Sequence, residues 1–496
     1  MPQAAASSVP LEDRQYRFRH DVLREAAYAT LTEGDRRLGH HLAGEWLARN
    51  GERRAAALAA HFEQGGDRVR AAYYHARAAD QALAANDLDG ALEHASCSAA
   101  SGATGETLGE LRLVEATVHH WRAAHEAEHG AALEAMRLLP PLGASWYRAI
   151  EELAEASLPL SDVDTLVALA DALEEAPAAL RDGAASRTAF RTAAATLTMQ
   201  LALAGRRDAA HAVMARLEAS LEDEAPPPLA RARTEFARGT LAMIDGDLGR
   251  VIEHARAAVD AFEEAGDLRS AALMRSNLAW GYAEIGAWTE AEPELRAAAA
   301  VAERMGLAFV LGGVKNNLGL VLARRGQLHE ALVVAEESAA FYRTIVNQRM
   351  EGQSRVYVAM IHGLAGDLDA AEREARAAVA GLASIRPTRA HALAQLAQVL
   401  LARGREAEAN AAAAEASAIL DELGGIDEGE TLVRLVRAET LALAGEKDAA
   451  RAALSAAKQR LLSRAAKISD AGWRESFVSS VPDNARTLAL AAVWQA

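Results

Sequence analysis

Apolar residues recur three and four positions apart along most of the chain, which is the spacing of an amphipathic α-helix. In "VKNNLGLVLARRG" (314–326), one such stripe leads to a glycine, and a second stripe follows it in "QLHEALVVAEESAAFY" (327–342). Two helices joined by a tight turn would produce this pattern. We therefore predict an all-α protein built from helical hairpins.

The turn between the two stripes recurs at a regular interval. It reads "LALAGRRDAA", "AMIDGDLGRV", "AEIGAWTEAE", "LARRGQLHEA", "HGLAGDLDAA", "LARGREAEAN" and "LALAGEKDAA", with glycines spaced by 41, 40, 40, 40, 38 and 41 residues: Gly205, Gly246, Gly286, Gly326, Gly366, Gly404 and Gly445. A fixed period of this size is typical of a solenoid, and we predict a right-handed α-solenoid of roughly ten hairpins. Each glycine suits a left-handed helix end, and the aspartate of the "GDL" turns can cap the next helix.

In this region the chain resembles the tetratricopeptide-repeat family. Two turns carry the signature's small and large positions: Leu278, Ala279, Tyr282, Trp288 and Ala291 around Gly286, and Leu318, Gly319, Leu322, Leu328 and Ala331 around Gly326. The resemblance covers residues 229 to 463 best. The period of about 40 exceeds the usual 34 and points to the longer-helix variety of kinesin light chains and bacterial signalling ATPases.

The repeats before residue 226 are less regular. Residues 71–95 form a good unit with Asn86 in place of the glycine, and residues 106–225 hold about three weaker ones. The proline-rich "APPPL" at 225–229 indicates a linker or sharp turn between the two halves.

Both ends of the chain resemble parts of large bacterial signalling proteins, in which a serine/threonine kinase or cyclase, a signal-transduction ATPase and a repeat arm follow one another. Residues 16–48 resemble the junction of such an ATPase with its arm, through Phe18, Arg19, His20, Ala27, Tyr28, Arg37, Leu38 and His40. Residues 465–491 resemble the closing segment. The chain contains neither a Walker A motif nor the kinase H-R-D and D-F-G motifs, so ATP chemistry is not assigned to it.

Composition supports a helical interaction protein and excludes several other classes. The 496 residues are 51% hydrophobic but only 5% aromatic, and the formal net charge is -16. Without a basic run we expect no nucleic-acid partner. A single cysteine, Cys97, and the lack of an apolar span or leader peptide predict a cytoplasmic protein without a membrane segment.

One short pattern raises the question of metal chemistry. "HEAEH" (125–129) matches H-E-x-x-H, in which His125 and His129 would bind zinc and Glu126 would act as a base. The repeat phase puts Gly130 near a turn, so we expect these residues in the last turn of a helix, where a zinc peptidase site is not held. We therefore predict no metal and no cofactor, with a zinc hydrolase as a remote alternative. The irregularly spaced His20, His40, His41, His61 and His75 are expected to be surface or capping residues.

The concave face of a solenoid is a more plausible binding surface, because the first helix of each hairpin lines it. One ladder position reads Asn277, Asn317, Tyr357 and Gln395, and three steps further it reads Trp280, Leu320, Met360 and Gln398. Amides can pair with a peptide backbone while large apolar groups bury its side chains. Related repeats hold peptide backbones with an asparagine here. The competing interpretation is that these residues pack against the neighbouring repeat.

The predicted organisation is a disordered tail (1–13), a remnant of an ATPase-associated subdomain (14–65), degenerate repeats (66–225), regular repeats (226–464) and a C-terminal helical cap (465–496). The predicted function is non-catalytic: a scaffold or regulatory arm in bacterial signal transduction that binds a protein or peptide in its groove. The alternative is the sensor arm of a serine/threonine kinase or signal-transduction ATPase, of which this chain is a fragment or a shortened relative.

Overall fold

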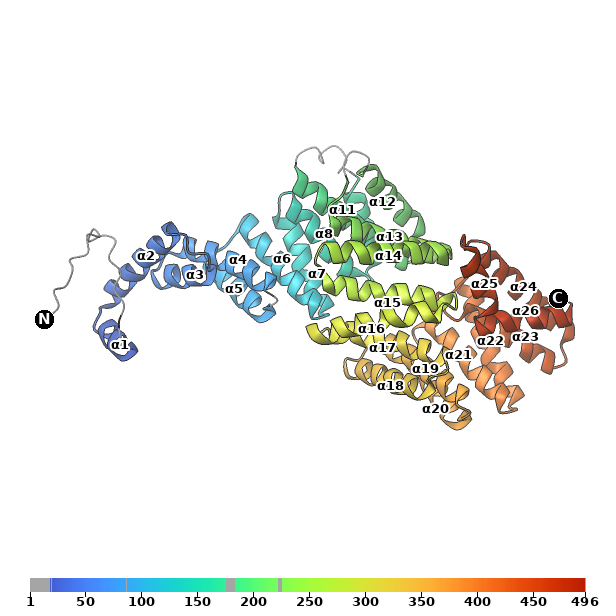
Figure 1. Ribbon diagram of the computed structural model, residues 1–496. Helices are drawn as coiled ribbons and strands as arrows, with labels where there is room; N and C mark the ends of the chain where they lie inside the picture. The colour runs from blue at the N-terminus through green and yellow to red at the C-terminus, as the bar shows by residue number, and fades with distance from the viewer. Residues whose placement is uncertain (1–17, 19, 86, 175–182, 222–224, 496) are drawn as a thin grey trace. The chain divides into compact units, whose positions relative to one another are not determined.

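The computed structural model describes residues 18, 20–85, 87–174, 183–221 and 225–495, and all regular structure among them is α-helical (Figure 1). The chain divides into two compact units, unit 1 (residues 1–160) and unit 2 (residues 161–496). Of the junction and turn residues singled out in the sequence, Arg19 and Asn86 lie outside the described residues. None of the described helices is both long and apolar enough to cross a lipid bilayer.

The helices of unit 1 are α1 (Asp21–Ala29), α2 (Glu33–Arg49), α3 (Ala55–Gln64), α4 (Arg68–Ala84), α5 (Leu88–Ala100), α6 (Gly105–Trp121), α7 (His125–Leu138) and α8 (Ala144–Ser157). Those of unit 2 are α9 (Val163–Ala172), α11 (Ala184–Leu203), α12 (Arg207–Ala219), α13 (Pro228–Asp245), α14 (Leu248–Glu264), α15 (Leu268–Glu284), α16 (Trp288–Met305), α17 (Ala308–Arg324), α18 (Leu328–Thr344), α19 (Gln348–Leu364), α20 (Leu368–Gly381), α21 (Arg386–Ala402), α22 (Glu406–Leu423), α23 (Glu430–Leu443), α24 (Lys447–Ala465), α25 (Ala471–Ser479) and α26 (Pro482–Trp494).

Successive helices pack as antiparallel hairpins, which confirms the predicted α-solenoid. In unit 2 the pairs are α13/α14, α15/α16, α17/α18, α19/α20, α21/α22 and α23/α24. All seven glycines of the predicted turns have a positive φ, between 71° and 83°. The aspartates that follow Gly246 and Gly366 accept hydrogen bonds from Arg250 N and Ala370 N, respectively, so they cap the next helix as expected.

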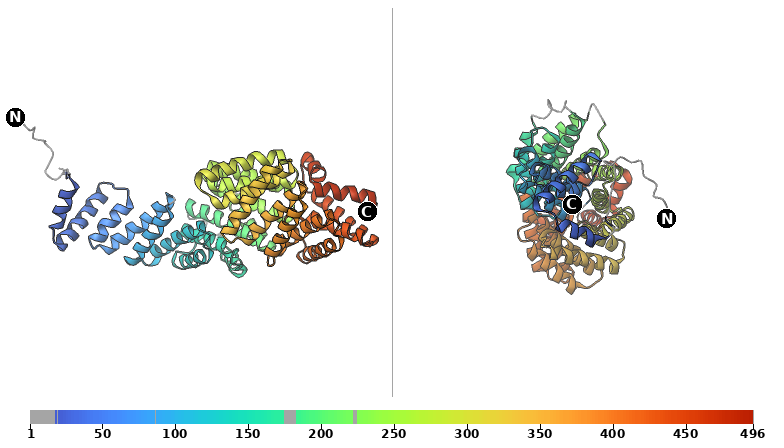
Figure 2. Two further views of the ribbon diagram at one scale, coloured as in Figure 1. Left: turned by 90° about the horizontal axis from the view of Figure 1, so that it is seen from below. Right: turned by 90° about the vertical axis from the view of Figure 1, so that its left-hand side faces the viewer.

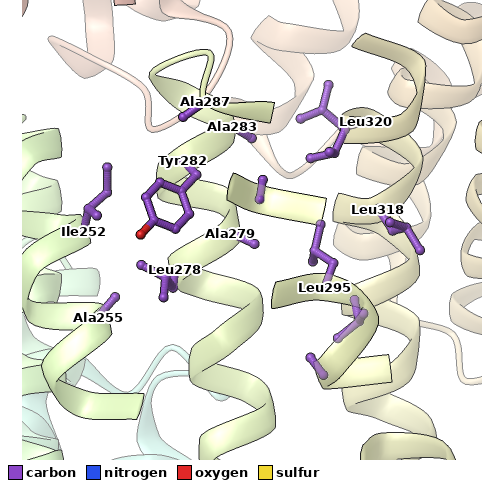
Figure 3. Packing of buried hydrophobic residues seen from close by; sticks show 14 of the residues in the cluster. Ile252, Ala255, Leu278, Ala279, Tyr282, Ala283, Ala287, Leu295, Leu318 and Leu320 are labelled. Carbon is purple, nitrogen blue, oxygen red and sulfur yellow. The ribbon is translucent and has the colours of Figure 1, made fainter. Parts of the chain in front are cut away.

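The residues of the tetratricopeptide signature form the core of unit 2. Figure 3 shows Leu278, Ala279 and Tyr282 of α15 packed with residues of α14 and α16. Gly319 allows α17 and α18 to approach closely, because a Cβ atom at this position would lie 2.9 Å from the Cβ of Ala335. Small residues at the closest points therefore set the helix spacing, and large ones fill the space around them.

In unit 1 the helical hairpins persist, but one turn differs from the prediction. Residues 125–129 are not the last turn of a helix; His125 begins α7, and Gly130 lies inside it. The turn is made by Ala123, which adopts a positive φ of 53° without being glycine. The predicted phase was wrong because it placed the turn near Gly130, 44 residues after Asn86, whereas the residue with a positive φ is Ala123.

The last helices of unit 2 fold back onto its early repeats. In the C-terminal segment (residues 466–495), Lys467 donates a hydrogen bond to the carbonyl of Asp245, 222 residues earlier in the chain. The ring of Trp473 meets that of Tyr282 edge to face, with centroids 6.2 Å apart, and Phe477 is buried in the same core cluster. Figures 1 and 2 show α25 beside the ends of α14 and α15. The segment thus joins the end of the repeat array to α14 and α15.

Candidate binding pocket

The first helices of the regular hairpins form one continuous surface. Helix α15 contacts α17, α17 contacts α19, α19 contacts α21, and α21 contacts α23. These contacts between alternate helices place corresponding positions of each repeat side by side. The ladder predicted from the sequence is therefore carried by adjacent helices.

A pocket of about 350 Å³ lies on this surface within unit 2. Its walls come from α15, α17, α19 and α21, from the loop between α22 and α23, and from α24, α25 and α26. The C-terminal segment supplies residues 477 and 481–484 as well as 486. The return of the chain end to the early repeats therefore turns an open surface into a pocket.

The pocket contains five of the eight predicted ladder residues: Leu320, Tyr357, Met360, Gln395 and Gln398. The remaining three, Asn277, Trp280 and Asn317, are half-buried in the earlier repeats and do not line it. The ladder thus separates into a part that reaches the pocket and a part that does not.

The helical period extends the ladder by one more turn. A third ladder position, seven residues beyond the first, reads Glu284, Arg324, Leu364 and Ala402, and all four line the pocket. Residues at i, i+3 and i+7 share one face of a helix, so this extension was accessible from the periodicity alone. Of the charged groups that line the pocket, Glu284 and Arg324 lie at this third position, whereas the others come from outside the ladder.

The centre of the pocket is held by a contact between distant repeats. Tyr357 donates a hydrogen bond of 2.5 Å from its hydroxyl to Glu428 Oε1, and Gln353 donates one of 2.7 Å to Glu428 Oε2. Glu428 lies in the loop between α22 and α23, 71 residues after Tyr357. This loop therefore reaches across α21 to α19, and no local sequence pattern predicts the contact.

Burial dominates the electrostatics of the pocket. It raises the pKa of Glu284, and the carboxylate of Glu428 adds to the effect; it also raises the pKa of Glu428, although the hydrogen bond from Tyr357 opposes this. Burial lowers the pKa of His391 to about 4, so this imidazole is neutral at physiological pH. The guanidinium groups of Arg324 and Arg464 are the positive charges that act on Glu284.

Several ladder residues have internal partners, as the packing interpretation proposed. Asn317 donates a hydrogen bond of 3.1 Å to Ser276 Oγ in the preceding repeat. Gln395 donates one of 3.3 Å to Gln398 Oε1 on its own helix. A bound peptide would therefore have to exchange with these contacts or extend them.

The "HEAEH" residues lie elsewhere, in unit 1. Glu126, the glutamate of the pattern, is exposed, whereas Glu128 is fully buried. Glu128 accepts from the imidazoles of His120 (2.9 Å) and His125 (3.2 Å). Burial alone would lower the pKa of His120, but the hydrogen bond to Glu128 and the charge of Glu155 raise it to about 9. The helix face that carries Glu128, and not the one that carries Glu126, meets the imidazoles.

The five amino-terminal histidines do not assemble into one cluster within the described part of the chain. His40 and His61 face each other at 3.0 Å between their Nδ1 atoms, while His75 faces His94 at 3.2 Å. His20 is an exposed residue before α1. His40 also forms a hydrogen bond of 2.8 Å with the hydroxyl of Tyr28, which joins α1 to α2.

Comparison with known proteins identifies the fold. No protein-family profile matches the sequence, and no curated protein matches it either. A signal-transduction ATPase with numerous domains and a tetratricopeptide-repeat sensor, from Pyrococcus horikoshii, is similar with a TM-score of 0.53 and 14% identity, over 85% of this chain and 68% of that one. A Rap protein complexed with competence and sporulation factor is similar with a TM-score of 0.50 and 15% identity, over 71% of this chain and all (100%) of that one. The chain thus shares the fold of helical-repeat proteins of the tetratricopeptide type.

Proposed function

We propose that this chain is a non-catalytic regulatory scaffold of bacterial signal transduction that binds a protein or peptide through the pocket in unit 2. The observation that carries the proposal is the convergence of three ladder positions on one pocket. There, Leu320 and Met360 supply apolar surface, and Gln395 and Gln398 supply amides. Such a combination of apolar walls with a few polar groups is typical of binding sites.

The size of the pocket restricts how a partner would bind. A volume of about 350 Å³ lies at the lower end of the range for ligand sites and accommodates a few side chains. We therefore infer that one or two anchor side chains of the partner enter the pocket. The rest of an extended segment would follow the ladder toward Asn317, Trp280 and Asn277.

The structural relatives support this proposal without identifying the partner. The Rap protein was crystallised with competence and sporulation factor, and the Pyrococcus protein carries its repeats as a sensor. Both use a helical-repeat fold in a signalling context. A cytoplasmic role for the present chain belongs to the same proposal.

Site-specific photocrosslinking tests the proposal. A photoreactive amino acid at Gln398 lies in the pocket, and the same amino acid at Ala411 lies on the exposed side of α22, outside the pocket. We expect a discrete partner to be crosslinked from host lysate through position 398 only. Gln395→Ala combined with Leu320→Ala is expected to weaken this partner's binding by at least about tenfold, roughly 1.4 kcal/mol.

Three outcomes would contradict the site or a part of it. Equal crosslinking at positions 398 and 411 would indicate nonspecific contact with the surface of unit 2 instead of binding in the pocket. Unchanged affinity after Asn277→Ala with Asn317→Ala would show that the ladder residues outside the pocket do not bind the partner. Unchanged affinity after Gln395→Ala with Leu320→Ala would show that the pocket does not bind it.

The sensor-arm alternative is supported by a second surface, in unit 1. Helix α1 buries none of its residues, and Val22 is 76% and Leu38 59% exposed; Leu23, Leu42 and Trp46 are exposed as well. Exposed apolar groups in this number mark an interaction surface. We infer that a kinase or signal-transduction ATPase module covers α1 and α2.

This alternative is tested separately from the pocket. Val22→Asp with Leu38→Asp places charge on the exposed face without disturbing a buried residue. We expect the variant to lose co-purification with a kinase or ATPase of the host while it keeps the crosslink through position 398. Retained co-purification would contradict the alternative.

A further inference from the structure

Three consecutive helices of unit 1 bring half-buried imidazoles and carboxylates together around one fully buried carboxylate. His120 lies at the end of α6, His125 and Glu128 lie in the first turns of α7, and Glu152 comes from α8. Glu128 has no exposed surface (0%). The cluster therefore sits where α6, α7 and α8 meet.

The separations between these groups are close to those of metal ligands. Glu128 Oε1 is 2.9 Å from His120 Nδ1, and Glu128 Oε2 is 3.2 Å from His125 Nδ1. One ligand atom each of His120, Glu128 and Glu152 lies within 4.8 Å of the other two. Tetrahedral zinc with bonds of about 2.0–2.1 Å separates its ligands by about 3.3 Å, so small side-chain rotations suffice.

The charge balance also favours a cation. Glu128 and Glu152 are two carboxylates in one interior cluster, and the carboxylates of Glu151 and Glu155 act on the cluster from nearby. Buried carboxylates need a compensating positive charge, and without metal the imidazolium of His120 supplies one to Glu128. A divalent cation compensates two of them at once.

A neighbouring side chain already orients one of the carboxylates. Thr117 of α6 donates a hydrogen bond of 2.6 Å to Glu152 Oε1 and leaves the second oxygen of Glu152 available. Hydrogen bonds of this kind are typical of the groups around a metal site, where they fix the direction of a ligand.

We propose that unit 1 holds a divalent transition-metal ion, with zinc as the fitting ion, between His120, Glu128 and Glu152, while His125 orients Glu128 through its second oxygen. Imidazole and carboxylate ligands without a thiolate suit zinc. Its three protein ligands come from α6, α7 and α8, so the ion ties these helices together, and water completes the tetrahedron. It differs from the peptidase site that "HEAEH" suggests, because Glu126 is exposed and takes no part.

Zinc itself is the probe, used on the full chain without a histidine tag. After chelation and dialysis against zinc, elemental analysis is expected to find one ion per chain. Titration calorimetry is expected to show at least tenfold weaker binding for Glu152→Gln, which removes a charge while keeping the shape and the hydrogen bond to Thr117. The matched control, Glu126→Gln, changes the same motif on its exposed side and is expected to bind as the wild type does.

Two further measurements separate a metal site from a buried ion-pair network. Cobalt in place of zinc is expected to give the intense visible absorption of a four-coordinate ion, which His120→Gln abolishes. Zinc is expected to slow hydrogen exchange in residues 105–157 of the wild type but not of Glu152→Gln. Circular dichroism of each variant without metal establishes that it is folded.

Three results would overturn the proposal. The first is no stoichiometric zinc in the wild type. The second is equal uptake by the wild type and Glu152→Gln, which would indicate adventitious surface binding only. The third is an equal loss of affinity in Glu126→Gln and Glu152→Gln.

Discussion

The two units use the same turn geometry but different residues to make it. In unit 2 a positive φ recurs every 20 residues, at Gly246, Gly266, Gly286, Gly306, Gly326, Val346 and Gly366. In the described part of unit 1 it falls at irregular intervals, at Gly51, Gly66, Gly102, Gly105, Ala123 and Leu142. The left-handed turn residue is thus shared, whereas the regular 20-residue spacing belongs to unit 2, and glycine is replaced in both units, at Ala123 and Leu142 and at Val346.

This difference shows that the turns are defined by backbone conformation and do not require one particular residue type. The packing of each helix on the next determines where the chain must reverse, and glycine only lowers the energy of that reversal. Where packing is sufficient, alanine or leucine adopts the same conformation. A glycine count consequently finds the repeats of unit 2 and misplaces those of unit 1.

The units also differ in how their polar groups are gathered. In unit 2, charged and amide side chains from α15 to α26 surround a pocket. In unit 1, the corresponding groups of α6, α7 and α8 form a compact cluster around the buried Glu128. The first arrangement surrounds a space that a partner's side chain can enter, whereas in the second the groups contact one another directly through hydrogen bonds.

The largest expected effect separates the stability of the two units. Phe477 is 2% exposed in the core that joins the C-terminal segment to α14 and α15. Phe477→Ala should destabilise unit 2 by about 3–5 kcal/mol and leave unit 1 unchanged. Hydrogen exchange followed by mass spectrometry measures both units in one sample. Val493→Ala, on an exposed position of α26, is the control, and faster exchange in α3 to α8 would contradict the prediction.

A pH titration should sharpen the comparison through His391. Its folded-state pKa of about 4 lies below the ordinary value of 6.5, so as pH falls the unfolded chain binds the proton first. This group should therefore reduce the stability of unit 2 by up to about 3 kcal/mol between about pH 6.5 and 4. The raised pKa values of Glu284 and Glu428 act in the opposite direction, so the informative quantity is the difference between wild type and variant.

Denaturant unfolding at pH 7 and pH 4.5 provides the measurement. His391→Gln should flatten the pH dependence, while His329→Gln, on an exposed position of α18, should leave it unchanged. Parallel curves for the wild type and His391→Gln would show that the burial of His391 does not contribute to stability.

Two glycine-to-alanine substitutions should have opposite signs in the two units. Gly319→Ala pushes a methyl group to 2.9 Å from the Cβ of Ala335 and should destabilise unit 2 by about 1–3 kcal/mol. Gly130→Ala meets nothing within 4 Å inside α7 and should stabilise unit 1 by about 0.5–1 kcal/mol. Chemical denaturation measures both. A stabilising Gly319→Ala would show that the contact between α17 and α18 relaxes freely.

The smallest effect tests the shared turn directly. Val346 has a φ of 57° at a turn position that is occupied by glycine in the neighbouring repeats. A left-handed backbone conformation costs a residue other than glycine about 1–2 kcal/mol. Val346→Gly should stabilise unit 2 by about 0.5–1 kcal/mol, because the greater freedom of glycine in the unfolded chain cancels part of the gain. Thermal unfolding measures it. Val333→Gly, inside α18, should instead destabilise by about 1 kcal/mol.

The fold could be predicted from the sequence because the hydrophobic stripes and the turn glycines of unit 2 repeat with the same period. Leu278, Ala279 and Tyr282 were identified from their spacing to Gly286, and they are buried as that spacing requires. The turn near Gly130 was misplaced because no residue type in the sequence around Ala123 indicates a positive φ.

The candidate site was only partly predictable. The ladder residues Leu320, Met360 and Gln398 follow from the helical period, which is a local property. Glu428 meets Tyr357 only because a loop 71 residues later reaches across α21, and such a contact depends on how several repeats curve together. That interaction is a tertiary property, which single-sequence periodicity does not contain.

The contact between Lys467 and Asp245 has a consequence during protein synthesis. A helical-repeat protein can ordinarily fold repeat by repeat as it leaves the ribosome. Here 222 residues must be added after Asp245 before its partner exists, which takes roughly 10–45 seconds at ordinary translation rates. For that interval the apolar residues that Phe477 later covers stay exposed on the nascent chain, so we expect chaperones to bind unit 2 until α25 has been made.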